Sequence, residues 1–385
     1  DTISTQFDYH SIDHNLLTLD ILGHDDPTMI RMLQDMTGRD PLTIPLDGSD
    51  VMSLFQNTDA LGITPEQIGG TRLGALGIPE FGTDFAMQMV IDAKPQAFSD
   101  LVRISGLSHG TNVWLGNAQD LIMSGVATIS TAICTRDDIM LYLIQMGVEP
   151  EKSFKIMEAV RKGMVAKGKC GQWEEWKEDM LAHKVPQWYI DSCQKIEYMF
   201  PKAHAAAYVM MAWRIAYCKI HYPLAYYGAF FSIRAKAFSY EQMCQGQAHM
   251  EAIMKEYKRR MDAVANKEAG AQPLSNKEEL AYGDMRVVQE MYARGFEFEP
   301  IDIFKAQSRS FQIVGDKLMP SLSSIDGLGE KAADAIVEAA KDGPFLSRDD
   351  FRERTKVSKT VVDLMAQLGL LGDLPESNQL SLFDF

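Results

Sequence analysis

The residues with the clearest capacity for chemistry lie on one predicted helix that begins at residue 201. The stretch 201–208 reads Pro-Lys-Ala-His-Ala-Ala-Ala-Tyr, in which proline fixes φ at the start and the alanines favour helix. Because a helix turns once in about 3.6 residues, His204 and Tyr208 lie on one face. Lys202 lies beside the helix mouth, where exposed N–H groups attract anions. The pattern predicts a groove lined by imidazole and phenol beside a phosphate site.

The simpler explanation is a buried helix in which His204 and Tyr208 are ordinary polar tips. Met211 and Ile215 continue the same face, as they would in a helix packed against a core. Spacing alone favours this simpler explanation, so the groove hypothesis depends on evidence from the rest of the chain.

A second group with functional potential is a glycine turn near the C-terminus. Residues 324–333 read Ser-Ile-Asp-Gly-Leu-Gly-Glu-Lys-Ala-Ala and resemble the hairpin of helix-hairpin-helix DNA-binding modules. Gly327 and Gly329 lack Cβ atoms, so the amides at the next helix can approach a backbone phosphate, with Lys331 close by. A glycine turn that merely caps a helix is the alternative, and a later helical pair at 357–366 gives weak support for a duplicated module.

The last residues carry one apolar cluster in a polar tail, Gln-Leu-Ser-Leu-Phe at 379–383. This matches the pentapeptide by which replication and repair proteins dock on the bacterial sliding clamp. Leu382 and Phe383 would fill an apolar pocket, Leu380 would extend the contact, and Gln379 would hydrogen-bond at the rim. The alternative is a tail folded onto its own core, although free tails rarely keep exposed Leu and Phe without a partner.

These groups need a scaffold, and the periodicity predicts a mostly helical one. At 385 residues the chain exceeds the roughly 250–300 residues at which single cores stop growing, so it divides into several units. A β-like run at 16–23 leads to a helix capped by Asp26, with Pro27 at its first position. The further predicted elements are a glycine-broken contact segment over 48–120, a helical core over 136–234, a solvated helix and linker over 255–276, and a β-like run over 309–314 that turns at 315–316.

Composition narrows the class of protein more than its function. The net charge of −15 argues at first against a nucleic-acid partner, although local amides and a few aimed cations still bind phosphate. No apolar run reaches the roughly 18–20 residues that span a bilayer and no signal peptide is visible, so we expect a cytoplasmic protein. The five scattered cysteines indicate reduced thiols rather than a zinc site. A start without Met leads us to expect a fragment or a processed chain.

The stretch 201–208 is one of a series of short sequence motifs that match one protein family. Together with Arg-Ile-Ala-Tyr at 214–217 and His-Tyr-Pro at 221–223, it resembles the fingers helix of PolC-type DNA polymerase III alpha subunits, the replicative polymerases of Gram-positive-type bacteria. Further words match in the family's order: Phe-Gly-Thr at 81–83, Ile-Ser-Gly-Leu-Ser-His-Gly-Thr at 104–111, Trp-Leu-Gly-Asn-Ala at 114–118 and Arg-Asp-Asp-Ile-Met at 136–140. The similarity covers nearly the whole chain, as a C-terminal portion of such a subunit, and is weaker at 161–181 and 240–300.

The resemblance implies a mainly α, multi-domain fold with small β elements. Its expected parts are the end of a polymerase-β-like palm at 1–47, helical fingers at 48–235, a connecting segment at 236–308, a duplex-binding segment with helix-hairpin-helix at 309–372 and a flexible clamp-binding tail at 373–385. The implied function is DNA-directed DNA synthesis in chromosomal replication, a nucleotidyl transfer. Its implied partners are primer–template DNA, deoxynucleoside triphosphates, the sliding clamp (beta subunit) and other replisome subunits.

For catalysis the resemblance implies two magnesium ions held by palm carboxylates. The family's third aspartate lies in a Leu-Asp-Ile-Leu-Gly-like strand and matches Asp20, which is therefore the predicted metal ligand and catalytic residue. The family's Asp-x-Asp pair has no counterpart here. We therefore expect this chain to be inactive by itself, since one carboxylate cannot hold both ions.

Cations must neutralise the triphosphate of the incoming nucleotide. The matched segments offer Arg136, Lys202 and His204, and further His109 and Arg103, with Tyr208 on the same helix face. For Arg136 a salt bridge at its own helix start is an equally good explanation.

Two other functions remain open at this point. The first is a non-enzymatic adaptor that binds DNA and the clamp, which accounts only for the last sixty or so residues. The second is a helical metabolic enzyme that binds a nucleotide phosphate at the helix of 201–208, which nothing in the tail supports.

Overall fold

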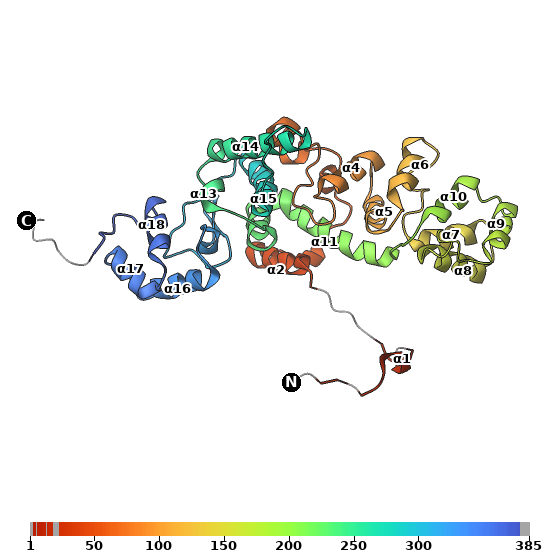
Figure 1. Ribbon diagram of the computed structural model, residues 1–385, viewed down its shortest axis with the longest axis horizontal. Helices are drawn as coiled ribbons and strands as arrows, with labels where there is room; N and C mark the ends of the chain where they lie inside the picture. The colour runs from red at the N-terminus through yellow and green to blue at the C-terminus, as the bar shows by residue number, and fades with distance from the viewer. Residues whose placement is uncertain (1–2, 5, 13, 18–22, 378–385) are drawn as a thin grey trace, which may run out of the picture.

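The protein is an elongated assembly of helices, seen in a computed structural model that describes residues 3–4, 6–12, 14–17 and 23–377 (Figure 1). In these ranges the structure has many helices and a single sheet of two strands. The predicted mainly α class with small β elements is confirmed. None of the helices in the described ranges combines the length and the hydropathy needed to cross a membrane.

One half of the molecule surrounds a large core that extends from Ile44 to Ala216. Its helices are α3 (Ser49–Ser53), α4 (Asp84–Ala93), α5 (Phe98–His109), α6 (Gln119–Met123), α7 (Arg136–Gln145), α8 (Pro150–Arg161), α9 (Trp173–Ala182) and α10 (Gln187–Lys195). Short turns join them: η1 (Pro41–Thr43), η2 (Asp59–Leu61), η3 (Pro65–Ile68) and η4 (Trp114–Ala118). The glycine-rich segment predicted to be irregular is indeed a series of short helices and turns, held in place by this core.

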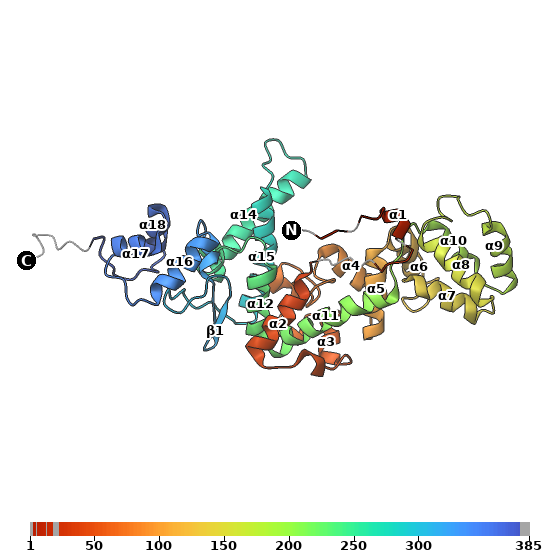
Figure 2. The same cartoon turned by 90° about the horizontal axis from the view of Figure 1, so that it is seen from below.

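The long helix α11 (Lys202–His221) passes from this half into the middle of the molecule (Figure 2). It packs against α5, against α2 (Asp25–Thr37) and against α12 (Pro223–Ala229), which follows directly. The helix therefore connects segments that are far apart in the sequence. Any site on its N-terminal half is built by residues from several elements.

The middle of the molecule has its own core, to which Met29 and Leu33 of α2 contribute. The other elements are η5 (Phe230–Arg234), α13 (Tyr240–Met243), and the neighbouring helices α14 (Gln247–Ala265) and α15 (Asn276–Ala293). The predicted cap of α2 is wrong by two residues, because His24 is the N-cap and Asp26 lies in the first turn. Asp26 is instead fully buried and pairs with Arg234, a distant partner that local sequence could not indicate.

A third core belongs to the C-terminal part. Strands β1 (Gln312–Val314) and β2 (Lys317–Met319) pair antiparallel around a turn with Gly315. The predicted turn at 315–316 is confirmed, but the β-like run predicted at 309–314 is shorter and its partner strand was not predicted. The remaining elements are η6 (Leu322–Ser324), α16 (Glu330–Ala340), α17 (Arg348–Thr355) and α18 (Lys359–Gln367). Near the N-terminus the short α1 (Tyr9–Ile12) is described, whereas most of the predicted β-like run at 16–23 lies outside the described residues.

Candidate functional site

The N-terminal half of α11 carries a row of ring side chains. The rings of His204 and Tyr208 lie 4.6 Å apart between centroids, which confirms that they share a helix face. Phe200, just before the helix, stacks on His204 at 4.9 Å. In the described part of the chain, neither the imidazole of His204 nor the hydroxyl of Tyr208 has a hydrogen-bond partner. Both polar groups are therefore available to a ligand.

A second imidazole, His109 at the end of α5, faces this row. Its ring centroid is 6.2 Å from that of His204. Its Nδ1 lies 2.7 Å from the carbonyl oxygen of Ser105, and its Nε2 lies 3.0 Å from Oε2 of Glu80. The interaction with the Glu80 carboxylate raises the pKa of His109, while partial burial works against this increase.

The neighbouring imidazole has the opposite tendency. Burial lowers the pKa of His204, and the charge of His109 lowers it further. The pKa shifts of the two histidines are therefore opposite: the surroundings favour the charged form of His109 and the neutral form of His204. We use the name ring groove, after the groove predicted from the sequence, for the surface formed by Glu80, His109, His204 and Tyr208.

Tyr208 also contacts the residue that caps α2. His24, the N-cap of this helix, lies 4.9 Å from Tyr208 between ring centroids. Asp26 lies behind it, 2.8 Å from Nη1 of Arg234 and 3.5 Å from Nδ1 of His24. Burial raises the pKa of Asp26, His24 and Arg234 oppose that change, and the charge of Glu80 adds to it. The charge of Glu80 thus acts on Asp26 as well as on His109.

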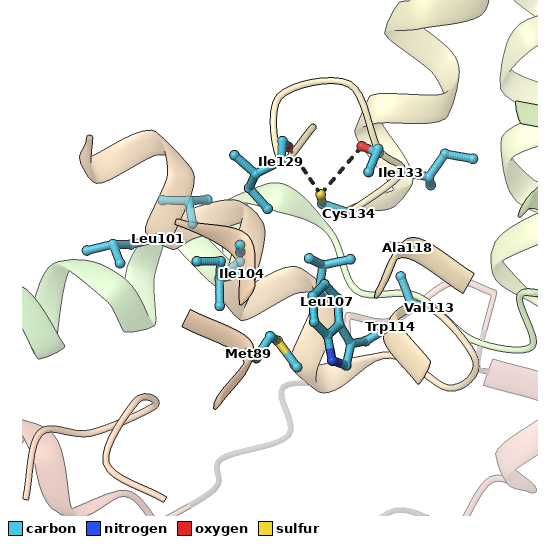
Figure 3. Close-up of a cluster of buried hydrophobic side chains, with 14 of the residues drawn as sticks. Met89, Leu101, Ile104, Leu107, Val113, Trp114, Ala118, Ile129, Ile133 and Cys134 are labelled. Atoms are coloured by element: carbon cyan, nitrogen blue, oxygen red, sulfur yellow. Dashed lines mark hydrogen bonds between the residues drawn. The ribbon is translucent and has the colours of Figure 1, made fainter. Parts of the chain in front are cut away.

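Helix α5, which ends at His109, packs on the cluster of buried apolar side chains shown in Figure 3. Ile104 and Leu107 of α5 are buried there together with Trp114. Cys134 closes the cluster, with its thiol 3.7 Å and 3.4 Å from the carbonyl oxygens of Ile129 and Ala132. Because α5 is fixed along this face, the His109 at its end has a defined position.

Two predicted cations lie beside the row of rings. Arg136 begins α7, and its backbone N–H donates to the carbonyl of Phe200 at 3.2 Å. Its expected salt-bridge partners are already engaged, since Asp137 accepts from the backbone of Lys202 at 2.6 Å and Asp138 accepts from the backbone of Thr135 at 2.8 Å. In the described part of the chain the guanidinium of Arg136 forms no ion pair, so it is free to meet an anion.

The mouth of α11 differs from the prediction. Pro201 is the N-cap, not the first helical residue, and the first helical N–H, that of Lys202, is occupied by Asp137. The side chain of Lys202 is 41 % exposed, and its Nζ lies 3.9 Å from Oδ1 of Asp138. The side chain of Lys202 is therefore more accessible to a phosphate than the backbone N–H at the start of α11.

Arg103 has a different environment from the other predicted cations. Its Nη1 donates to the carbonyl of Ser130 at 2.8 Å and lies 3.4 Å from that of Ile129. The side chain holds the loop before α7 against α5. Its predicted role in nucleotide binding stays a prediction, but its visible contacts are structural.

Several predicted residues fall outside the described ranges. They are Asp20 of the metal site and Gln379, Leu380, Leu382 and Phe383 of the tail. Among the residues that the structure does describe, no group of three or more His, Cys, Asp or Glu side chains is placed to hold a metal ion. The predicted metal ligand and clamp contacts therefore stay predictions.

The glycine turn of the C-terminal part has the expected shape. Gly327 has a φ of 80°, a conformation that favours glycine, and Gly329 is the N-cap of α16. A Cβ atom built on either residue would meet no other atom within 4 Å, so the turn is open on its outer side. The backbone N–H of Asp326 is bound by both carboxylate oxygens of Glu241 at 3.1 Å, which fixes the turn to α13.

Sequence reasoning did not identify Glu80, His24 or Arg234 as parts of the site. Each lies far from residue 204 in the chain, and their proximity comes from tertiary packing. The feature of the sequence that came closest to indicating Glu80 was the Phe-Gly-Thr motif at 81–83, which directly follows it.

Comparison with known proteins gives a consistent result. Residues 26–184 match the model of the bacterial DNA polymerase III alpha subunit finger domain, and residues 295–380 match that of the helix-hairpin-helix motif. The chain is 53% identical over 381 residues to the "DNA polymerase III PolC-type" of Streptococcus pneumoniae serotype 2 (strain D39). It is 53% identical over 380 residues to that of Bacillus cereus (strain ATCC 14579). In both cases 99% of this chain is covered but only 25% of the relative, so the chain spans about a quarter of the length of the curated relatives it matches.

Proposed function

The chain belongs to the PolC-type DNA polymerase III family, and on that premise we propose that it is the nucleotide-, duplex- and clamp-binding part of a DNA-directed DNA polymerase. The observation that carries the proposal is the ring groove on α11 with two partly exposed cations nearby, Arg136 at the start of α7 and Lys202 at the start of α11. The finger-domain match at 26–184 covers Arg136 and most of the groove's surroundings, although α11 itself lies beyond it. A replicative polymerase of this kind acts in the cytoplasm, where the bacterial chromosome is copied.

In this proposal the ring groove receives the incoming deoxynucleoside triphosphate. Arg136, Lys202 and His109 supply positive charge for the phosphates, since charge-assisted hydrogen bonds to phosphate are roughly twice as strong as neutral ones. His204 and Tyr208 offer ring faces and unpartnered polar atoms for orienting the ligand. These residues bind and orient, which is how a phosphoryl-transfer site achieves most of its catalysis.

The metal chemistry belongs to residues that the described structure does not contain. Magnesium, when bound by Asp20 together with an aspartate pair outside this chain, supplies the charge that activates the primer hydroxyl and holds the pyrophosphate. We therefore propose that this chain does not extend a primer by itself.

The C-terminal module holds the duplex in this proposal. The amides of the turn at Gly327 and Gly329 meet a backbone phosphate at the N-terminus of α16, and Lys331 adds a cation. Such contacts read no base sequence, as a replicative enzyme requires. The tail at 379–383 docks on the sliding clamp through Leu382 and Phe383, and other replisome subunits assemble on the same complex.

Photo-crosslinking tests the groove directly. The purified chain is mixed with primed DNA, magnesium and an azido derivative of dATP, irradiated, and digested for mass spectrometry. We expect the label on peptides that contain His204 or Arg136, and an excess of dATP should abolish it. Label confined to peptides that contain neither Arg136 nor a residue of the ring groove would contradict the proposal.

Clamp binding is tested separately with the double variant Leu382→Ala and Phe383→Ala. We expect the intact chain to bind purified sliding clamp and primed DNA, and the variant to lose only the clamp. The adaptor alternative also predicts this result, but it predicts no nucleotide crosslink. The two experiments together therefore separate a polymerase part from an adaptor.

A further inference from the structure

We propose that Glu80 is a positioning residue that holds His109 as a cation facing the ring groove. The inference rests on the proposed function of the groove, which it deepens by naming the group that sets the charge of one predicted nucleotide ligand. It is carried by the backbone of Glu80, by the fixation of its loop and by the atoms that surround His109.

The backbone of Glu80 is unusual for its residue type. Its φ of 70° lies in the left-handed region, which glycine adopts freely and other residues adopt at a cost. It lies between Pro79 and Phe81, both buried, so it cannot relax by moving its neighbours. A carboxylate retained at such a position points to a task for the side chain.

The loop before Glu80 is tied to the helix that carries the ring row. Nζ of Lys219 on α11 donates to the carbonyl oxygens of Gly74 and Leu76 at 2.7 Å each. The hydroxyl of Tyr226 donates to Leu76 as well, at 2.9 Å. A Cβ atom at Gly77 would lie 2.3 Å from the Tyr226 hydroxyl, so only glycine permits this approach. Glu80 is therefore placed rigidly with respect to α11.

The carboxylate of Glu80 is directed at His109. Its side chain is 10% exposed against 33% for His109, and Oε2 lies 3.0 Å from Nε2 of the imidazole. This buried oxygen has no well-aligned hydrogen bond, so the charge of the imidazole is its main compensation. Nδ1 of His109 lies 2.7 Å from the carbonyl oxygen of Ser105 and 3.0 Å from the hydroxyl of Ser108. That hydroxyl itself donates to the Ser105 carbonyl at 2.9 Å, so both oxygens can accept from an N–H group at Nδ1. An imidazole with oxygen acceptors at both nitrogens is best satisfied in its doubly protonated form.

The remaining charged and titratable neighbours do not replace this partner. His204 on α11 is the titratable ring next to His109, with 6.2 Å between the centroids, and it favours its neutral form. Asp26 on α2 is paired with Arg234 of η5 and with His24. Since His109 is the more exposed member of its pair with Glu80, an anionic ligand that enters the groove meets the cation first.

The direct test follows the titration of His109 by NMR on the full chain with ¹³C-labelled histidine. The His109 signal is assigned with a His109→Gln variant among the eight histidines of the chain. We expect the titration midpoint of His109 to fall by about one pH unit in Glu80→Gln, roughly a tenfold loss in proton affinity. The matched control is Glu66→Gln, the same change on η3, where the side chain lines a different hollow with Gln247 and Lys255. An unchanged His109 midpoint in Glu80→Gln would overturn the inference.

A second measurement separates positioning from a purely structural role. Binding of dATP to the chain with primed DNA is compared at pH 7.5 and pH 5.5 for the wild type and Glu80→Gln. We expect severalfold weaker binding in the variant at pH 7.5 and equal binding at pH 5.5, where His109 is protonated in both. An equal loss at both pH values would contradict the inference, because a structural defect is not repaired by acid. Glu80→Gly, which removes the backbone strain, should show the same pH pattern with no loss of thermal stability.

Failure of this inference and failure of the proposed function give different results. A wild-type chain that binds no nucleotide, with a His109 midpoint that still falls in Glu80→Gln, would refute the nucleotide function and support the pair. If the wild type binds nucleotide but the His109 midpoint is unchanged in Glu80→Gln, the proposed function is supported. The positioning role of Glu80 is then refuted.

Discussion

Lys219 and Glu290 form a fully buried ion pair between α11 and α15, with 2.8 Å between Nζ and Oε1. The same ammonium donates to two carbonyls of the loop before Glu80, and Oε1 of Glu290 also accepts from the hydroxyl of Tyr227 at 2.7 Å. Burial lowers the pKa of Lys219 to about 8, although the charge of Glu290 acts in the opposite direction. The pair therefore joins the helix of the ring groove, the loop that carries Glu80 and the middle core.

Replacing Lys219 by Met should destabilise the chain strongly, because the buried carboxyl group of Glu290 would lose its ionic partner. Removal of one member of such a pair costs about 3–5 kcal/mol. Urea unfolding followed by circular dichroism measures the loss. The double variant Lys219→Met and Glu290→Gln should recover much of it, since no buried charge remains. A single variant within about 1 kcal/mol of the wild type would show that the pair is not as isolated from water as the structure indicates.

His204 should make the folded chain less stable as the pH falls. Its pKa is lowered on folding, so as pH falls through the unfolded value near 6.5 the unfolded chain binds the proton first and the folded state loses stability. The substitution His204→Gln removes this loss of stability at low pH, because glutamine does not titrate. We therefore expect the stability of the variant relative to the wild type to improve between pH 7 and pH 5, as measured by urea unfolding at each pH. His109→Gln is the opposing control: the pKa of His109 is raised, so the stability it adds is fully present below about 6.5 and is lost as pH rises through the folded value.

Arg136 and Arg103 provide a matched pair for separating binding from structure. The guanidinium of Arg136 has no ion pair in the described part of the chain, whereas that of Arg103 binds loop carbonyls. Arg136→Ala should weaken dATP binding by about tenfold or more, the loss of one charge-assisted hydrogen bond, with little change in melting temperature. Arg103→Ala should lower the melting temperature. Calorimetric binding and thermal unfolding of both variants check this, and the reverse assignment of effects would show that Arg103 is the nucleotide ligand.

The parts of the site that follow from local sequence were predictable, and the parts that depend on tertiary contacts were not. The face shared by His204 and Tyr208 follows from helical period, and the turn at Gly315 follows from local glycine chemistry. Glu80 gave no such signal, because neither its left-handed backbone nor its proximity to His109 can be read from neighbouring residues. Asp26 shows the same limit in reverse: its residue type suggested a cap, but a buried partner from η5 determines its position.

The proposed duplex contact can be tested on a single helix, since α16 carries a lysine at its N-terminal end and another just after its last residue. Lys331 lies beside the turn at Gly329, and Lys341 is the C-cap, where it pairs with Glu338 at 2.6 Å. If the turn meets a phosphate, Lys331→Ala should weaken binding to primed DNA.

The same substitution should also change the salt dependence of that binding. Loss of one phosphate contact lowers the slope of log affinity against log salt by about 1, because one fewer counterion is released. Lys341→Ala removes an equal charge and leaves the turn intact, so it should change affinity far less. Fluorescence anisotropy with a labelled duplex over a range of salt concentrations distinguishes the two. Equal effects of both substitutions would indicate general electrostatic attraction along α16 and would argue against a phosphate held at the turn.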